Sequence, residues 1–130
     1  MELKSKPYAY TVLAVDDDAA ILDLIGRNLT ARGLRVITTT DPEKVPALAA
    51  QEKPRLILSD IAMPGLDGLT LLKTLKASPA TRDIPLILLT SSRAAEDIED
   101  GLNSGAEAYL VKPIDWESAW PKIQAILMRS

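Results

Sequence analysis

Short apolar runs alternate five times with segments whose apolar residues have helical spacing, and this alternation is the strongest constraint on the fold. The predicted strands are Tyr10–Val15, Arg35–Thr39, Leu56–Ser59, Pro85–Thr90 and Ala108–Val111. A repeated strand-helix order builds a parallel sheet with helices on both faces and right-handed crossovers. We therefore expect an α/β, doubly wound, flavodoxin-like fold of five strands and five helices. The strand order 2-1-3-4-5 is assigned by analogy with other sheets of this size.

Short acidic residues stand where four of the predicted helices begin. An aspartate there caps a helix, because its carboxylate accepts hydrogen bonds from the free amides of the first turn. The predicted caps are Asp18, Asp41, Asp67 and Asp115. We assign Asp67-Gly68 to a cap and turn with no chemical role. The first three helices should end by Gly33, near Gln51 and near Ala77, the fourth should span about Ala94–Ser104 before Gly105, and the last should run nearly to the end.

Prolines disturb two of these helices. Pro46 makes the first turns of the second helix doubtful, and Pro121 should bend the last helix because it removes one hydrogen bond. Trp116 and Trp120 lie four residues apart on that last helix. Core packing and a partner-facing patch are equally good interpretations of this pair.

Composition excludes several classes of function. The chain has 130 residues, a formal net charge of -3, and no cysteine or histidine. This excludes disulfides, thiolate or imidazole metal sites and histidine-dependent catalytic triads. The charge argues against nucleic acid or an anionic membrane as the main partner. We expect an arm at residues 1–9, one domain at residues 10–130, and a cytoplasmic location, since we find no secretory signal and no membrane-length apolar run.

Polar side chains follow four of the predicted strands. Asp16–Asp18 follow the first strand, Asp60 the third, Thr90–Ser92 the fourth and Lys112 the fifth. In an open parallel sheet the ligand site lies beyond the carboxyl ends of the strands. We therefore expect carboxylates, hydroxyl groups and one amine to meet at this edge.

The predicted set suits phosphoryl transfer. Crowded carboxylates repel each other unless a cation lies among them, and oxygen ligands without histidine or cysteine favour Mg2+. Lys112 supplies a positive charge, and Thr90 a hydroxyl donor, for phosphoryl oxygens. A carboxylate such as Asp60 can act as the nucleophile and form an aspartyl phosphate.

Four segments resemble the successive motifs of response-regulator receiver domains. They are VDDD at 15–18, SDIAMPGLDG at 59–68, LLTSS at 88–92 and YLVKP at 109–113, and the similarity runs from about Thr11 to Met128. Each motif alone is weak, but four in this order after predicted strands are strongly specific. The resemblance implies a two-component signalling switch that accepts a phosphoryl group from the phosphohistidine of a sensor histidine kinase or a histidine phosphotransfer protein.

The resemblance also implies a role for each residue. Asp60 would be phosphorylated, and Mg2+ would bind to Asp16, Asp17, Asp60 and the carbonyl of Ala62. Lys112 would hold a phosphoryl oxygen, and its bond to Pro113 would be cis.

A surface change would follow phosphorylation by the same resemblance. Thr90 would move toward the phosphoryl group and Tyr109 would follow it inward. The fourth helix, fifth strand and last helix would then present a changed surface to a downstream protein. Ser91 and Ser92 are interpreted as small or solvent-facing residues. Ala62 and Ser92 would flank the attacking water, but they indicate no direction for the phosphoryl lifetime.

Two other functions remain open at this point. A pseudo-receiver would bind a partner without phosphorylation, although the intact acid set, Thr90 and Lys112 argue against it. A haloacid-dehalogenase-type phosphatase also uses an aspartyl nucleophile, and Asp16-Asp17-Asp18-Ala19 loosely resembles its start. Such enzymes usually have a longer chain or an additional cap domain over the active site. We therefore expect self-phosphorylation and autodephosphorylation but no enzymatic turnover.

Overall fold

Five parallel strands form one sheet in the order β2-β1-β3-β4-β5, which confirms the predicted topology. The computed structural model describes residues 10–91 and 95–129, so the expected arm at residues 1–9 lies outside the described residues. The strands are β1 Thr11–Val15, β2 Arg35–Thr39, β3 Leu56–Asp60, β4 Leu86–Thr90 and β5 Ala108–Val111.

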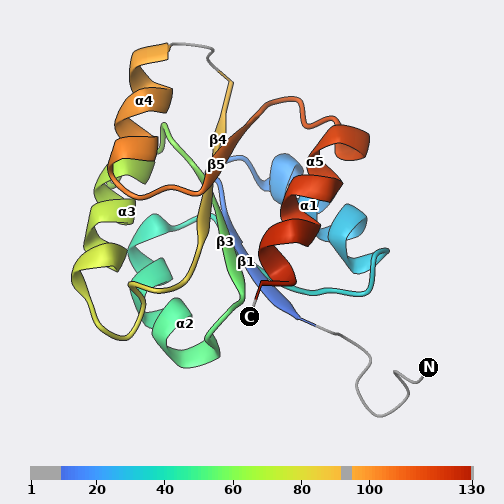
Figure 1. Ribbon diagram of the computed structural model, residues 1–130, viewed down its shortest axis with the longest axis horizontal. Helices are drawn as coiled ribbons and strands as arrows, with labels where there is room; N and C mark the ends of the chain where they lie inside the picture. Colours follow the sequence, from blue (N-terminus) through green and yellow to red (C-terminus); the bar gives the residue numbers. More distant parts are fainter. Residues whose placement is uncertain (1–9, 92–94, 130) are drawn as a thin grey trace.

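Helices cover both faces of the sheet. Figure 1 shows α1 and α5 on one face and α2, α3 and α4 on the other. Their bounds are α1 Ala19–Thr30, α2 Val45–Glu52, α3 Gly68–Ala77, α4 Ala95–Asn103 and α5 Trp116–Leu127, with a 3-10 turn, η1, at Pro42–Lys44. This is the three-layer arrangement expected of a doubly wound fold. Ala94, the predicted start of the fourth helix, lies outside the described residues.

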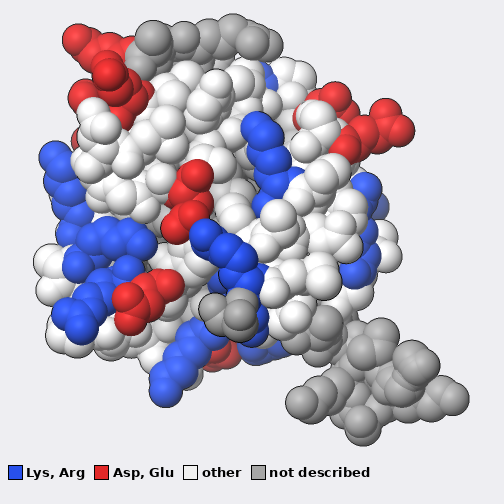
Figure 2. All heavy atoms as spheres, viewed as in Figure 1, with Lys and Arg blue, Asp and Glu red and all other residues white. Residues whose placement is uncertain are grey.

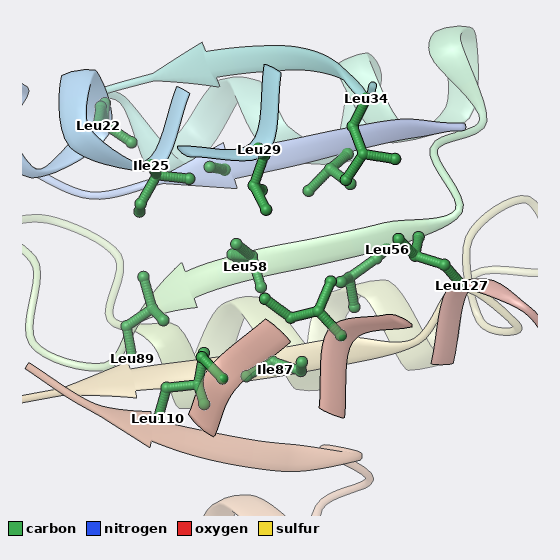
Figure 3. Packing of buried hydrophobic residues seen from close by; sticks show 14 residues of the cluster. Leu22, Ile25, Leu29, Leu34, Leu56, Leu58, Ile87, Leu89, Leu110 and Leu127 are labelled. Atoms are coloured by element: carbon green, nitrogen blue, oxygen red, sulfur yellow. The ribbon is translucent and has the colours of Figure 1, made fainter. Parts of the chain in front are cut away.

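Alternation along each strand divides the core into two clusters. Val12 and Ala14 of β1 face α1 and α5, whereas Leu13 and Val15 face the opposite side. Figure 3 shows the first cluster, in which side chains from β3, β4 and β5 meet those of α1 and Leu127 of α5. Strands β3 and β4 are buried along their whole length, as expected for the centre of a parallel sheet.

The four predicted helix caps are confirmed. The carboxylates of Asp18, Asp41, Asp67 and Asp115 accept hydrogen bonds from first-turn amides at 2.8–3.1 Å. The predicted second helix consists of two segments. The 3-10 turn η1 begins after Asp41, and α2 begins at Val45 with Pro46 in its first turn. A proline is tolerated there because the first amides of a helix have no partner within it.

Helix α5 continues through Pro121 as one element from Trp116 to Leu127. Trp116 and Trp120 are half-buried and pack against the first core cluster. The guanidinium of Arg32 lies 5.4 Å from the centre of the Trp120 ring. The two indoles therefore contribute to the core while keeping part of their surface exposed. No helix in the described part of the chain is long and apolar enough to cross a bilayer.

Candidate functional site at the carboxyl edge of the sheet

The sheet brings the predicted site residues to one edge. Asp16 directly follows β1, Asp60 and Thr90 are the last residues of β3 and β4, and Lys112 directly follows β5. Because β1, β3, β4 and β5 are consecutive neighbours in the sheet, their carboxyl ends lie side by side. Asp16, Asp60 and Thr90 are all buried. Burial is unusual for carboxylates, so Asp16 and Asp60 require compensating partners.

Lys112 compensates two of the acids at once. Its Nζ lies 2.9 Å from Asp16 Oδ2 and 3.3 Å from Asp60 Oδ1. The side chain of Asp16 is 0% exposed, that of Asp60 7% and that of Lys112 14%, so these ion pairs are shielded from water. The second oxygen of Asp16, Oδ1, accepts a hydrogen bond of 2.9 Å from the Asp18 amide. Asp16 is thereby held on both of its oxygens.

Burial and charge set the protonation of the acceptor candidate. Burial, together with the neighbouring charge of Asp16, raises the pKa of Asp60 above its ordinary value of 3.8, and Lys112 only partly opposes this. Burial alone would lower the pKa of Lys112. The hydrogen bond to Asp16 and the charge of Asp60 outweigh burial, and they raise that pKa above 10.5. Lys112 is therefore charged at neutral pH, while ionised Asp60 lacks full compensation.

The acidic set fits a divalent cation. One carboxylate oxygen from each of Asp16, Asp17 and Asp60 lies within 4.8 Å of the other two. With the ammonium of Lys112, these three carboxylates carry a formal charge of -2. Asp17 is exposed, which leaves a side open to solvent water and to a phosphate-bearing ligand. An open, all-oxygen site of this charge suits Mg2+, which retains water ligands and shares coordination with phosphate.

The remaining predicted residues lie around this set. Tyr109 is half-buried in the second core cluster, and Lys122 Nζ lies 5.9 Å from the centre of its ring. Ala62 is exposed in the loop after β3, and Ser91 is exposed after β4. The peptide bond between Lys112 and Pro113 is cis, as predicted. Ser92 lies outside the described residues.

One residue at the site was missed by the sequence reasoning. Gly68, which we assigned only to a turn, is buried at the start of α3 against the backbone of Asp60. Its amide donates a 2.7 Å hydrogen bond to the Ile61 carbonyl. A glycine after a cap is common, and the sequence contains no local signal for this contact.

Fold and site together define a flavodoxin-like domain with a lysine-bridged acidic pocket at the carboxyl edge of its sheet. The family model described as response regulator receiver domain matches residues 12–124. The chain belongs to this family. Domains of the family take part in two-component signalling and accept a phosphoryl group on an aspartate, and they are signalling domains rather than turnover enzymes. The phosphatase alternative is therefore not supported.

Several known proteins are similar to this chain. It is 40% identical over 119 residues to the DNA-binding dual master transcriptional regulator RpaA of Synechocystis sp., an alignment that covers 92% of this chain and 49% of RpaA. It is 39% identical over 115 residues to response regulator PleD of Caulobacter vibrioides, covering 88% of this chain and 25% of PleD. The chain thus spans half or less of the length of these relatives.

Solved structures agree with the fold. The crystal structure of a putative response regulator from Chloroflexus aurantiacus superposes with a TM-score of 0.87 at 28% identity, covering 92% of this chain and 98% of that one. The similarity therefore extends over a whole receiver-sized chain.

Proposed function

We propose that this domain is phosphorylated on Asp60 and acts as a switch in two-component signalling. The observation that carries the proposal is the buried contact of Lys112 with both Asp16 and Asp60 at the carboxyl edge. A lysine held between two buried acids places a positive charge beside the nucleophile. It is ready to pair with a phosphoryl oxygen when one arrives.

The proposed reaction is a phosphoryl transfer from a partner's phosphohistidine. A carboxylate oxygen of Asp60 attacks the phosphorus atom and forms the new P–O bond. The P–N bond of the donor breaks, and its electron pair returns to the partner's imidazole. The donor lies on another protein or domain, since this chain contains no histidine. Sensor histidine kinases and histidine phosphotransfer proteins carry such donors.

Each residue of the pocket has a proposed part in this step. Asp16, Asp17, Asp60 and the carbonyl of Ala62 would hold Mg2+, which when bound offsets the negative charge that develops on the phosphoryl oxygens. Lys112 pairs with one of those oxygens, and the Thr90 hydroxyl donates to another. Hydrolysis of the aspartyl phosphate by water returns the domain to its starting state, without multiple turnover of a free substrate.

The output is proposed to pass through the face formed by α4, β5 and α5. Thr90 and Tyr109 lie at the root of this face, on neighbouring strands β4 and β5. Figure 2 shows acidic side chains gathered at the corner that α4 occupies in Figure 1. The α4 corner is acidic in this view, so we propose a downstream protein rather than nucleic acid or a membrane as the partner of this domain.

We assign residues 10–130 to the receiver and residues 1–9 to an arm, and we place the protein in the cytoplasm. The relatives are longer than this chain, so the switch described above is proposed for this domain and not for a whole protein of that length.

Intact mass spectrometry after incubation with acetyl phosphate and Mg2+ tests the proposal. We expect one phosphoryl adduct on the wild-type chain, none after chelation with EDTA, and none on the Asp60→Asn variant. Asp67→Asn is the control, because it removes an exposed carboxylate at a helix cap and should retain the adduct. A wild-type chain that stays unmodified, even with a phosphorylated histidine donor, would favour a pseudo-receiver.

A further inference from the structure

Gly68 fills a position in which no side chain fits. A Cβ atom built on Gly68 would lie 2.2 Å from the Asp60 carbonyl oxygen and 2.9 Å from the Ile61 α-carbon. Both of these atoms belong to backbone, which cannot move aside as the end of a flexible side chain can. The first residue of α3 therefore lies directly against the backbone that carries the phosphoacceptor candidate.

Hydrogen bonds hold the same stretch of backbone in place. The Ile61 amide donates to the Leu89 carbonyl of β4 at 3.0 Å, and the Ile61 carbonyl accepts from the Gly68 amide at 2.7 Å. The Asp60 carbonyl accepts from the Ser59 hydroxyl at 3.0 Å. The Asp60–Ile61 segment is thus fixed between β4 on one side and the start of α3 on the other.

Turn geometry does not explain the glycine. Gly33, Gly65 and Gly105 have φ angles of 86°, 87° and 113°, in the left-handed region that favours glycine. Gly68 is not among the positive-φ glycines and is the first residue of a helix. A side chain is excluded there by the close approach to Asp60, not by the backbone angles of the residue itself.

We propose that Gly68 is a positioning residue for phosphoryl acceptance. Asp60 and Ala62 flank Ile61, so the segment that Gly68 contacts sets both the acceptor carboxylate and the carbonyl proposed as a metal ligand. A side chain at residue 68 would displace this segment and so disturb the contact of Asp60 with Lys112. This inference rests on the proposed function, and it adds a residue that touches neither the phosphoryl group nor the metal.

The experiment compares Gly68→Ala with Gly26→Ala. Gly26 lies within α1, and a Cβ added there meets nothing within 4 Å, so it is a matched glycine-to-alanine control. Rates of phosphorylation by acetyl phosphate are measured at a temperature well below the midpoint of thermal unfolding, where each variant is fully folded. The second readout is the increase in the midpoint temperature when Mg2+ is added, which reports metal affinity without phosphorylation.

We expect Gly68→Ala to lower the phosphorylation rate about 100-fold, as misplacement of a reacting group by about 1 Å can do. We also expect a smaller rise of the midpoint with Mg2+, whereas Gly26→Ala keeps both wild-type values. If Gly68→Ala does not fold, it is repeated in the Gly26→Ala background, since alanine is favoured over glycine in a helix interior.

The outcomes separate this inference from the proposed function. Active wild-type and Gly26→Ala proteins, with a Gly68→Ala variant of unchanged rate and unchanged Mg2+ response, would overturn the positioning role. A variant that does not fold in either background would also overturn it, since Gly68 would then be required for the fold itself. If the wild type binds Mg2+ but takes no phosphoryl group, the proposed function fails, and the Mg2+ response still decides the position of the ligands.

Discussion

At the scale of single residues, the site holds carboxylates whose mutual repulsion a bound cation can relieve. Asp16 and Asp60 are buried beside each other, and Lys112 neutralises only part of their charge. The pKa of Asp60 is raised because burial and the charge of Asp16 outweigh the attraction of Lys112. Functional groups held in this way commonly reduce stability, and their replacement then increases it.

The first prediction concerns Asp60→Asn in the absence of metal. We expect this variant to be more stable than the wild type at neutral pH, by roughly 0.5–2 kcal/mol, because it removes an ionised group that burial and Asp16 disfavour. The pKa of Asp60 is higher in the folded than in the unfolded chain, so the folded wild type binds its proton more tightly. The advantage of asparagine should therefore be complete above the folded pKa and vanish as the pH falls toward 3.8.

Denaturant unfolding in EDTA at a series of pH values measures this difference. Asp67→Asn serves as the control, since its cap hydrogen bond can be retained by asparagine. A metal-free Asp60→Asn protein less stable than the wild type at neutral pH would show that the attraction of Lys112 exceeds the cost of burial.

At the scale of elements, α5 combines a strong anchor with an interruption. Ile123 and Leu127 are fully or almost fully buried, and the Arg129 carbonyl beyond the helix accepts a 2.6 Å hydrogen bond from Arg55. Pro121 lies on the exposed side between this anchored end and the turn that follows Lys112. A proline inside a helix leaves one carbonyl of the preceding turn without its usual amide. Burial beyond Pro121 is sufficient to hold the helix together.

The second prediction is that Pro121→Ala stabilises the domain by about 1–3 kcal/mol. Alanine restores the missing amide and has a much higher helix propensity, and residue 121 is exposed, so the change costs no core contact. Thermal unfolding measures the effect. Gln124→Ala on the same helix is the matched control and should change stability by less than about 0.5 kcal/mol. If Pro121→Ala does not increase stability, the helix accommodates proline at this position as well as it accommodates alanine.

At the scale of the whole molecule, the site and the α4–β5–α5 face share physical connections. The Lys112 amide donates a 2.8 Å hydrogen bond to the Thr90 carbonyl, and Leu88 of β4 pairs with Tyr109 of β5. A Cβ on Gly101 of α4 would lie 2.2 Å from Leu88 Cδ1, so helix and strand are in close contact. We therefore expect a displacement of Thr90 to reach β5 directly, through the Lys112 amide, and α4 through Leu88 of the same strand.

The third prediction is that a phosphoryl mimic with Mg2+ changes the rate of amide hydrogen exchange in residues 95–128 by about five-fold or more. A factor of this size lies at the lower end of the effects that ordinary allosteric coupling produces. Exchange in α1 and α2 should change less, because neither helix belongs to the proposed α4–β5–α5 output face. The Asp60→Asn variant treated in the same way is the control and should show no such change. Unchanged exchange in residues 95–128 of the wild type would refute the proposed output surface.

Much of this protein was predictable from local signals. The alternation of apolar runs determined a parallel sheet, because strands buried on both faces and amphipathic helices allow few other arrangements. The helix caps were also predictable from local sequence, because a cap is a contact between residues only two or three positions apart. The rule that carboxyl ends of parallel strands share one edge then assembled Asp16, Asp60 and Lys112 from distant parts of the sequence.

Only the tertiary structure decided distances and clearances between segments far apart in the chain. It showed that Lys112 lies nearer to Asp16 than to Asp60, that each of the two indoles of α5 lies partly in the core and partly at the surface, and that Gly68 leaves no room beside Asp60. These features depend on how closely separate elements pack, and packing is settled by many side chains together. Residue type and spacing determine which groups reach an edge of the sheet, whereas close packing determines which of them touch.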